Sequence, residues 1–128
     1  MDKDRDKEID KIIEKVRKDE EVIAVALFGS SLKGNGRDID VCLFLREKRD
    51  NLFMSRKKLE YAKEVGDGID VSIFQQLPVF IRIRILKEGR VLFVRDESLL
   101  YEIAFSTIKE FDFYEKIYNM YLGNVKGG

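Results

Sequence analysis

The sequence predicts an α/β (α+β) fold in which a mixed β-sheet of about four strands is flanked by helices. Two observations predict it: short apolar runs of strand length recur along the chain, and longer segments of helical periodicity separate them. The length of 128 residues predicts a single domain over residues 1–128. Its core is expected over about residues 22–96, followed by a C-terminal helix over residues 97–122.

The first two expected elements are a surface helix and a buried strand. Residues 2–21 are predicted to form an amphipathic helix, because charges of alternating sign surround an apolar stripe at helical spacing. The stripe consists of Ile9, Ile12, Ile13 and Val16. Residues 22–28 (VIAVALF) form a continuous apolar run that ends at Gly29, which is typical of a buried central strand.

Two further strands carry aspartates. Residues 38–45 (DIDVCLFL) alternate with period two, so Asp38 and Asp40 are expected on the same face of the strand. Residues 69–74 (IDVSIF) alternate in the same way and present Asp70. Because this strand is expected to neighbour the earlier one, the three carboxylates should converge.

A helix is expected between these strands and another after them. Residues 54–65 carry a helical apolar stripe that ends before two glycines. Residues 80–85 (FIRIRI) alternate like a strand, but Pro78 suits the first position of a helix and Gly89 suits the position after its end. We favour a helix there.

The end of the chain is expected to add one strand and one helix. Residues 91–94 predict a short strand, and residues 97–122 predict a long helix with apolar residues near helical spacing. Five aromatic side chains lie in the second half of this helix: Phe111, Phe113, Tyr114, Tyr118 and Tyr121. One face of one helix cannot bury five rings in a small domain, so a partner surface here is as plausible as a core role.

The composition excludes several classes of function. The chain has no histidine, which excludes Ser-His-Asp and Cys-His catalysis and imidazole metal ligands. Its single cysteine, Cys42, forms no intrachain disulfide or thiolate zinc site and is expected to be a small core residue. The 24 basic residues offset the 24 acidic ones, which disfavours a nucleic-acid partner.

The sequence favours a protein that stays in the cytoplasm. The charged start of the chain lacks the apolar segment of a signal peptide, and no run approaches the length of a membrane span. The basic excess in residues 46–58 includes only one aromatic residue, Phe53, so we interpret it as a solvated helix start.

The segment from residue 28 to residue 41 (FGSSLKGNGRDIDV) carries the candidate chemistry. Gly29 allows a sharp turn that brings backbone N–H groups close to an anion, and Ser30 can cap a following helical turn that favours phosphate. Ser31, Lys33 and Arg37 extend this candidate phosphate site, although basic residues in a glycine-rich loop are more often simply exposed.

The three aspartates predict a metal site. Carboxylates about 4 Å apart repel by roughly 4 kcal/mol at an effective dielectric near 20, so Asp38, Asp40 and Asp70 together call for a cation. Oxygen ligands without histidine or cysteine select a hard ion, Mg²⁺ or Mn²⁺. A phosphate site beside such ions fits in-line phosphoryl or nucleotidyl transfer from a nucleoside triphosphate.

These residues resemble a known family. Gly29-Ser30, Asp38-Ile39-Asp40 and the later Asp70 resemble the nucleotidyltransferase superfamily of DNA polymerase beta, and specifically its minimal stand-alone nucleotidyltransferases. The stretch from residue 86 to residue 96 (LKEGRVLFVRD) resembles the same group. The resemblance implies a polymerase-beta-like fold, a triphosphate bound by Gly29 and Ser30, metals bound by Asp38, Asp40 and Asp70, and deprotonation of the acceptor aided by Asp70.

The resemblance also implies a reaction and a partner. Minimal nucleotidyltransferases commonly pair with a helical HEPN-domain protein in toxin-antitoxin modules, where they transfer AMP from ATP to a tyrosine of the partner. The leading hypothesis is therefore a metal-dependent nucleotidyltransferase acting on an acceptor hydroxyl. The alternative is a catalytically silent member of the same fold that binds a partner, or pairs with itself as a homodimer, through the C-terminal helix.

Overall fold

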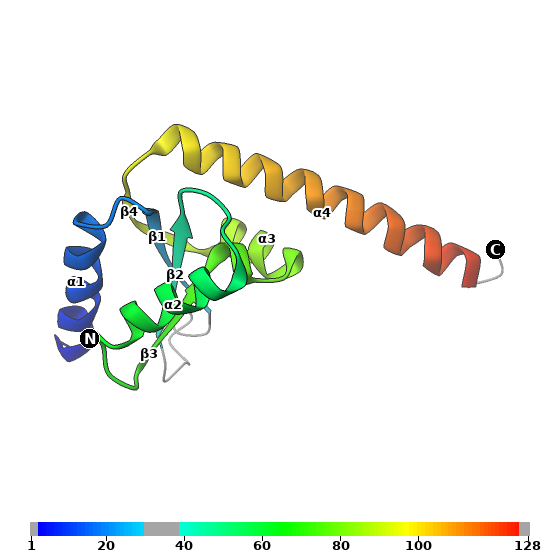
Figure 1. Cartoon of the computed structure of the whole chain (residues 1–128). Helices are drawn as coiled ribbons and strands as arrows, with labels where there is room; N and C mark the ends of the chain where they lie inside the picture. Colours follow the sequence, from blue (N-terminus) through cyan, green and yellow to red (C-terminus); the bar gives the residue numbers. More distant parts are fainter. Residues whose placement is uncertain (1–2, 30–38, 126–128) are drawn as a thin grey trace.

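The computed structural model of the chain describes residues 3–29 and 39–125. Four helices, one 3-10 helix and four strands follow one another in these residues (Figure 1). In chain order they are α1 (Lys3–Arg17), β1 (Val22–Phe28), β2 (Ile39–Leu45), α2 (Asn51–Ala62), β3 (Ile69–Ile73), η2 (Phe74–Gln76), α3 (Val79–Glu88), β4 (Arg90–Val94) and α4 (Glu97–Val125). The predicted mixed sheet with flanking helices is confirmed.

The four strands form one sheet in the order β3-β2-β1-β4. Strand β1 pairs antiparallel with both β2 and β4, whereas β2 and β3 run parallel. The apolar sequence of β1 accounts for its position between two partners, because its first five residues are buried on both faces of the sheet.

Each face of the sheet packs against its own pair of helices (Figure 1). Helices α1 and α2 cover the face to which β2 contributes Val41, Leu43 and Leu45. Helices α3 and α4, with η2, cover the face to which β2 contributes Cys42 and Phe44. This division confirms the predicted alternation of β2 and places Asp40 on the face of α3 and α4.

Several element ends differ from the expected ones. Helix α2 begins at residue 51, three residues earlier than expected, because the Asp50 carboxylate caps it by accepting a 2.8 Å hydrogen bond from the Phe53 backbone N–H. The segment after Pro78 is a helix, as favoured, but Pro78 is its N-cap and not its first helical residue. Gly89 caps its end with a φ of −70°, so no left-handed turn is used there.

The turn between α1 and β1 is joined to α2 by a partly buried polar cluster. Asp19 Oδ2 accepts hydrogen bonds from Lys57 Nζ and Tyr61 Oη, each at 2.9 Å. Burial alone would raise the pKa of Asp19, but these two donors outweigh it and hold the pKa below its ordinary value. The same burial and the hydrogen bond to Asp19 raise the pKa of Tyr61. The cluster therefore keeps an ionised carboxylate inside the fold.

Helix α4 extends well past the body of the molecule (Figure 1). It has 29 residues and reaches residue 125, three residues beyond its expected end. Only its first half packs on the core, through Leu99, Leu100 and Ile103. Large apolar side chains are exposed along it: Tyr101, Phe105, Ile108, Phe113, Tyr114, Ile117, Tyr118, Met120 and Tyr121. None of the helices in the described ranges has the length and apolar character needed to cross a bilayer.

Candidate functional site

Two of the predicted aspartates lie side by side at one end of the sheet. Asp40 and Asp70 are the second residues of β2 and β3, and they are direct partners in the parallel register of these strands. Neighbouring strands lie about 4.8 Å apart, and paired residues point to the same face. Asp40 is partly buried and Asp70 is exposed, so the pair is open to solvent at the edge strand.

Gly29 packs directly against the side chain of Asp40. Phe28 pairs with Asp40 across β1 and β2, and Gly29 then leaves the strand with a φ of +92°. A Cβ at position 29 would lie 2.0 Å from Asp40 Oδ2 and 3.0 Å from its Cγ. Glycine is therefore required twice, once by the backbone conformation and once by the carboxylate packed against it.

The remaining predicted site residues lie outside the described part of the chain. These are the third aspartate and the loop residues of the candidate phosphate site: Asp38, Ser30, Ser31, Lys33 and Arg37. Within residues 3–29 and 39–125, no group of three acidic, cysteine or histidine side chains is positioned to hold a metal ion. The described contribution to such a site is thus the pair Asp40 and Asp70.

The donor set of this pair fits a hard divalent cation. Two carboxylates separated by about 5 Å repel by roughly 3 kcal/mol at an effective dielectric near 20. A divalent ion with carboxylate ligands, completed by water and phosphate oxygens, would remove that repulsion. Mg²⁺ and Mn²⁺ both meet this description.

A small cavity adjoins Gly29 on the α3 side. Its volume is about 110 Å³, and Gly29 shares its wall with residues of β1 and α3. The other lining residues are Phe28, Ile81, Arg84, Ile85 and Glu88. Neither Arg84 nor Glu88 is among the site residues predicted from the sequence. Their i, i+3, i+4, i+7 spacing with Ile81 and Ile85 was the available signal, but it indicates only a shared helix face.

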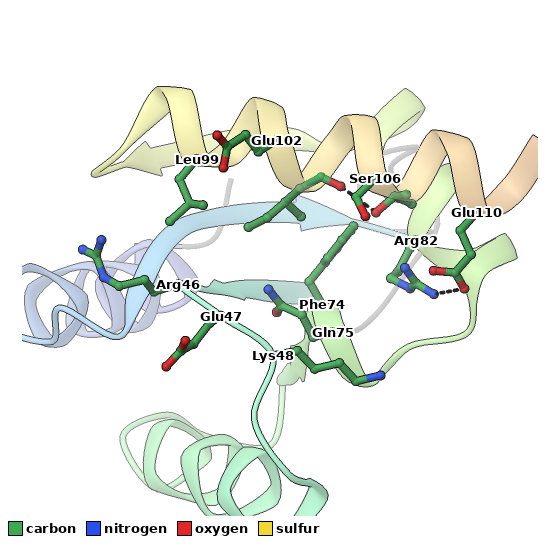
Figure 2. Close-up of a pocket in the computed structure, with 12 residues that line it drawn as sticks. Arg46, Glu47, Lys48, Phe74, Gln75, Arg82, Leu99, Glu102, Ser106 and Glu110 are labelled. Carbon is green, nitrogen blue, oxygen red and sulfur yellow. Dashed lines mark hydrogen bonds and ion pairs between the residues drawn. The ribbon is translucent and has the colours of Figure 1, made fainter.

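A larger cavity of about 330 Å³ lies at the other end of the sheet (Figure 2). Figure 2 shows Glu102 and Ser106 of α4 on one side of it and Phe74 and Gln75 on the other. Arg82 closes one end through an ion pair with Glu110 at 2.8 Å (Figure 2).

This cavity is remote from the aspartates. Its lining begins at Arg46, directly after β2, whereas Asp40 lies near the start of that strand. At about 3.3 Å per residue, the two ends are roughly 20 Å apart. Size alone does not make the larger cavity the site of the predicted chemistry.

Cys42 is a core residue, as expected. It is fully buried in the layer between the sheet and helices α3 and α4. Burial raises the pKa of its thiol, so the thiolate is not available as a nucleophile or metal ligand.

Structures of known proteins share this fold. A chain of the toxin-antitoxin MntA-HepT crystal structure aligns with a TM-score of 0.66 and 17% identity over 92% of this chain and 96% of that one. A toxin-antitoxin crystal structure with AMP-PNP gives 0.65 and 20% over 91% and 96%. A structure of tri-AMPylated Shewanella oneidensis HEPN toxin in complex with MNT antitoxin gives 0.64 and 14% over 92% and 98%.

Sequence comparison gives a relative and a family. A Methanocaldococcus jannaschii protein, named "Putative protein adenylyltransferase MJ1547", is 31% identical over 75 residues. The aligned region is 56% of this chain and 56% of that protein, so it spans just over half the length of the relative. The family model described as polymerase beta, nucleotidyltransferase, matches residues 10–98, which include Gly29, Asp40 and Asp70. With this match, the four-stranded mixed sheet and the paired aspartates, the chain belongs to the polymerase beta nucleotidyltransferase family.

Proposed function

We propose that this protein is a metal-dependent nucleotidyltransferase that transfers a nucleoside monophosphate, AMP from ATP, to an acceptor hydroxyl. The pairing of Asp40 with Asp70 beside Gly29 carries the proposal. Two side chains with oxygen ligands are strand partners, and Gly29, where the phosphate site is expected to begin, packs against one of them with no room for a side chain. The metal site at the aspartates and the phosphate site at Gly29 would thus bind the same nucleoside triphosphate.

Each residue then has a distinct task. Asp40 and Asp70, with Asp38, would hold Mg²⁺ or Mn²⁺, which supplies charge stabilisation for in-line displacement at a phosphoryl group. Asp70, which is exposed on the edge strand, would help to deprotonate an incoming acceptor hydroxyl. Gly29 lets the chain turn against Asp40 without a side chain in the way. Ser30, Ser31, Lys33 and Arg37 are proposed to contact the phosphates.

We further propose that the acceptor is a tyrosine of a HEPN-domain partner in the cytoplasm. Support comes from the similar structures, one of which contains an AMPylated HEPN toxin with its MNT antitoxin. Further support comes from α4, whose exposed aromatic and aliphatic side chains form a surface of the kind that protein partners cover.

Binding of Mg²⁺ and a non-hydrolysable ATP analogue, measured by calorimetry, tests the proposal. We expect magnesium-dependent binding in the unmodified protein and a loss of at least tenfold in Asp40→Ala and Asp70→Ala. Asp67→Ala, an exposed aspartate just before β3, is the matched control and should bind normally. Transfer of label from α-labelled ATP to a co-purified partner would complete the test. Equal binding by all three variants would contradict the metal site.

A second candidate function is a silent interaction module, which the exposed apolar side chains of α4 favour. In this reading the chain binds its partner, or a second copy of itself, without turnover. Tyr114→Ser combined with Tyr118→Ser should then abolish complex formation in sedimentation experiments, while Asp40→Ala leaves it intact. Label transfer by the unmodified protein that Asp40→Ala abolishes would reject the silent reading.

A further inference from the structure

Arg84 of α3 lies beside Gly29, the residue at which the phosphate site is expected to begin. It lines the small cavity beside Gly29, together with Phe28 from the end of β1. Asp40 is the strand partner of Phe28, and its carboxylate packs against Gly29. It lies on the face of the sheet that α3 covers. Arg84 therefore approaches the aspartate end of the sheet from the helix layer.

The charge of this region calls for a cation from the protein. Asp40 and Asp70 are both acidic, and a nucleoside triphosphate brings several further negative charges to the same place. Among the described residues that line the cavity at Gly29, Arg84 is the one basic side chain. A guanidinium suits phosphate oxygens because its planar N–H groups can donate two parallel hydrogen bonds.

Arg84 is available for such a contact. Its Nε lies 3.4 Å from Glu88 Oε2, and the side chains are 62% and 50% exposed. An exposed ion pair of this kind contributes little to stability, so exchanging Glu88 for a phosphate costs little. Arg82, two residues earlier, already has strong partners within the protein. It donates hydrogen bonds to the Leu77 carbonyl at 2.9 Å and to the Glu110 carboxylate at 2.8 Å.

We propose that Arg84 binds the terminal phosphates of the nucleoside triphosphate held beside Gly29, leaving Glu88 when the nucleotide arrives. The inference rests on the proposed function. The cavity of about 110 Å³ is far below the roughly 300 Å³ of a site for a whole small molecule, so it accommodates a phosphate-sized group only. Phe28, Ile81 and Ile85 give this cavity a partly apolar wall, beside which a charge-assisted hydrogen bond is stronger than in open solvent.

Binding of a labelled non-hydrolysable ATP analogue with Mg²⁺ tests the inference without relying on turnover. Arg84→Ala should weaken binding about tenfold, with an unchanged melting temperature, and Arg84→Lys should restore part of the loss. Glu88→Gln should bind severalfold more tightly, because it frees Arg84 and removes a negative charge. Lys87→Ala, a neighbouring basic residue that does not line the cavity, is the matched control and should bind like the unmodified protein.

Competition experiments with pyrophosphate and AMP show which part of the nucleotide Arg84 contacts. Pyrophosphate should displace the analogue less effectively from Arg84→Ala than from the unmodified protein, whereas competition by AMP should be equal in the two. Binding by Arg84→Ala within twofold of the unmodified protein would overturn the inference, as would an equal loss in Lys87→Ala or an equal loss for AMP and pyrophosphate. Absence of nucleotide binding by the unmodified protein would instead reject the proposed function.

Discussion

Replacing Gly29 with alanine tests the closest contact of the candidate site. The substitution acts in two ways, because it puts a side chain on a residue with a φ of +92° and places its Cβ 2.0 Å from Asp40 Oδ2. Backbone strain of this kind costs about 1–3 kcal/mol. The carboxylate must in addition rotate away, since ordinary contacts at a Cβ lie beyond about 3.4 Å. We therefore expect both a less stable protein and a displaced metal ligand.

The expected loss of stability is about 2 kcal/mol, which lowers the melting temperature of a chain of this size by roughly 5–10 °C. Thermal unfolding followed by circular dichroism measures it. Gly68→Ala is the matched control, because none of the described residues has an atom within 4 Å of a Cβ there and its φ is not positive. That variant should be neutral or up to about 1 kcal/mol more stable, since alanine restricts the unfolded chain.

A double variant separates the backbone strain at position 29 from the steric clash with the Asp40 carboxylate. In an Asp40→Ala background the carboxylate is absent, so Gly29→Ala should cost only the backbone strain and destabilise less than in the unmodified protein. Magnesium-dependent analogue binding should be lost in Gly29→Ala alone. If the cost is the same in both backgrounds and analogue binding persists, then Gly29 does not position Asp40 and the reasoning is refuted.

Three further measurements test the packing of the fold. The folded pKa of Asp19 is below its ordinary value, so its ionised form stabilises the native state above about pH 4, and this contribution is lost as pH falls through the folded pKa. The difference in unfolding free energy between the unmodified protein and Asp19→Asn should therefore shrink below about pH 4 in acid titrations. Cys42, buried and with a raised thiol pKa, should resist a thiol reagent in the native state and react at once in denaturant. Phe74→Ala removes a buried ring stacked on Phe44 at 4.2 Å and should cost about 3–5 kcal/mol in urea unfolding, whereas the exposed Phe80→Ala should cost little.

Local pattern was enough to predict most of the sheet. The apolar run of β1 has strand length and a glycine at its end, and the alternation of β2 separates Val41, Leu43 and Leu45 from Cys42 and Phe44 as observed. The same parity placed Asp40 on its face, because side chains in a strand alternate whatever the rest of the chain does. The aspartates could thus be chosen as candidates from the sequence.

Element ends and the segment around α3 were harder to predict. The alternating FIRIRI of α3 fits a strand by its pattern and a helix by its flanks, and only packing on the core decides between them. The start of α2 depends on whether the Asp50 side chain turns back to the Phe53 N–H, which is a choice of side-chain conformation. Such choices lie within a few tenths to about 1 kcal/mol, too little for sequence pattern to resolve.

The sequence by itself determined which residues could carry the chemistry: glycine after a buried strand, and aspartates at alternate positions of exposed strand ends. Only the tertiary structure decided that Asp40 faces Asp70, because a register between strands thirty residues apart is set by packing of the whole sheet. It also decided that Gly29 lies against Asp40 and that Arg84 reaches the same place from α3. Contacts between elements depend on how their faces are buried together, and no local pattern encodes them.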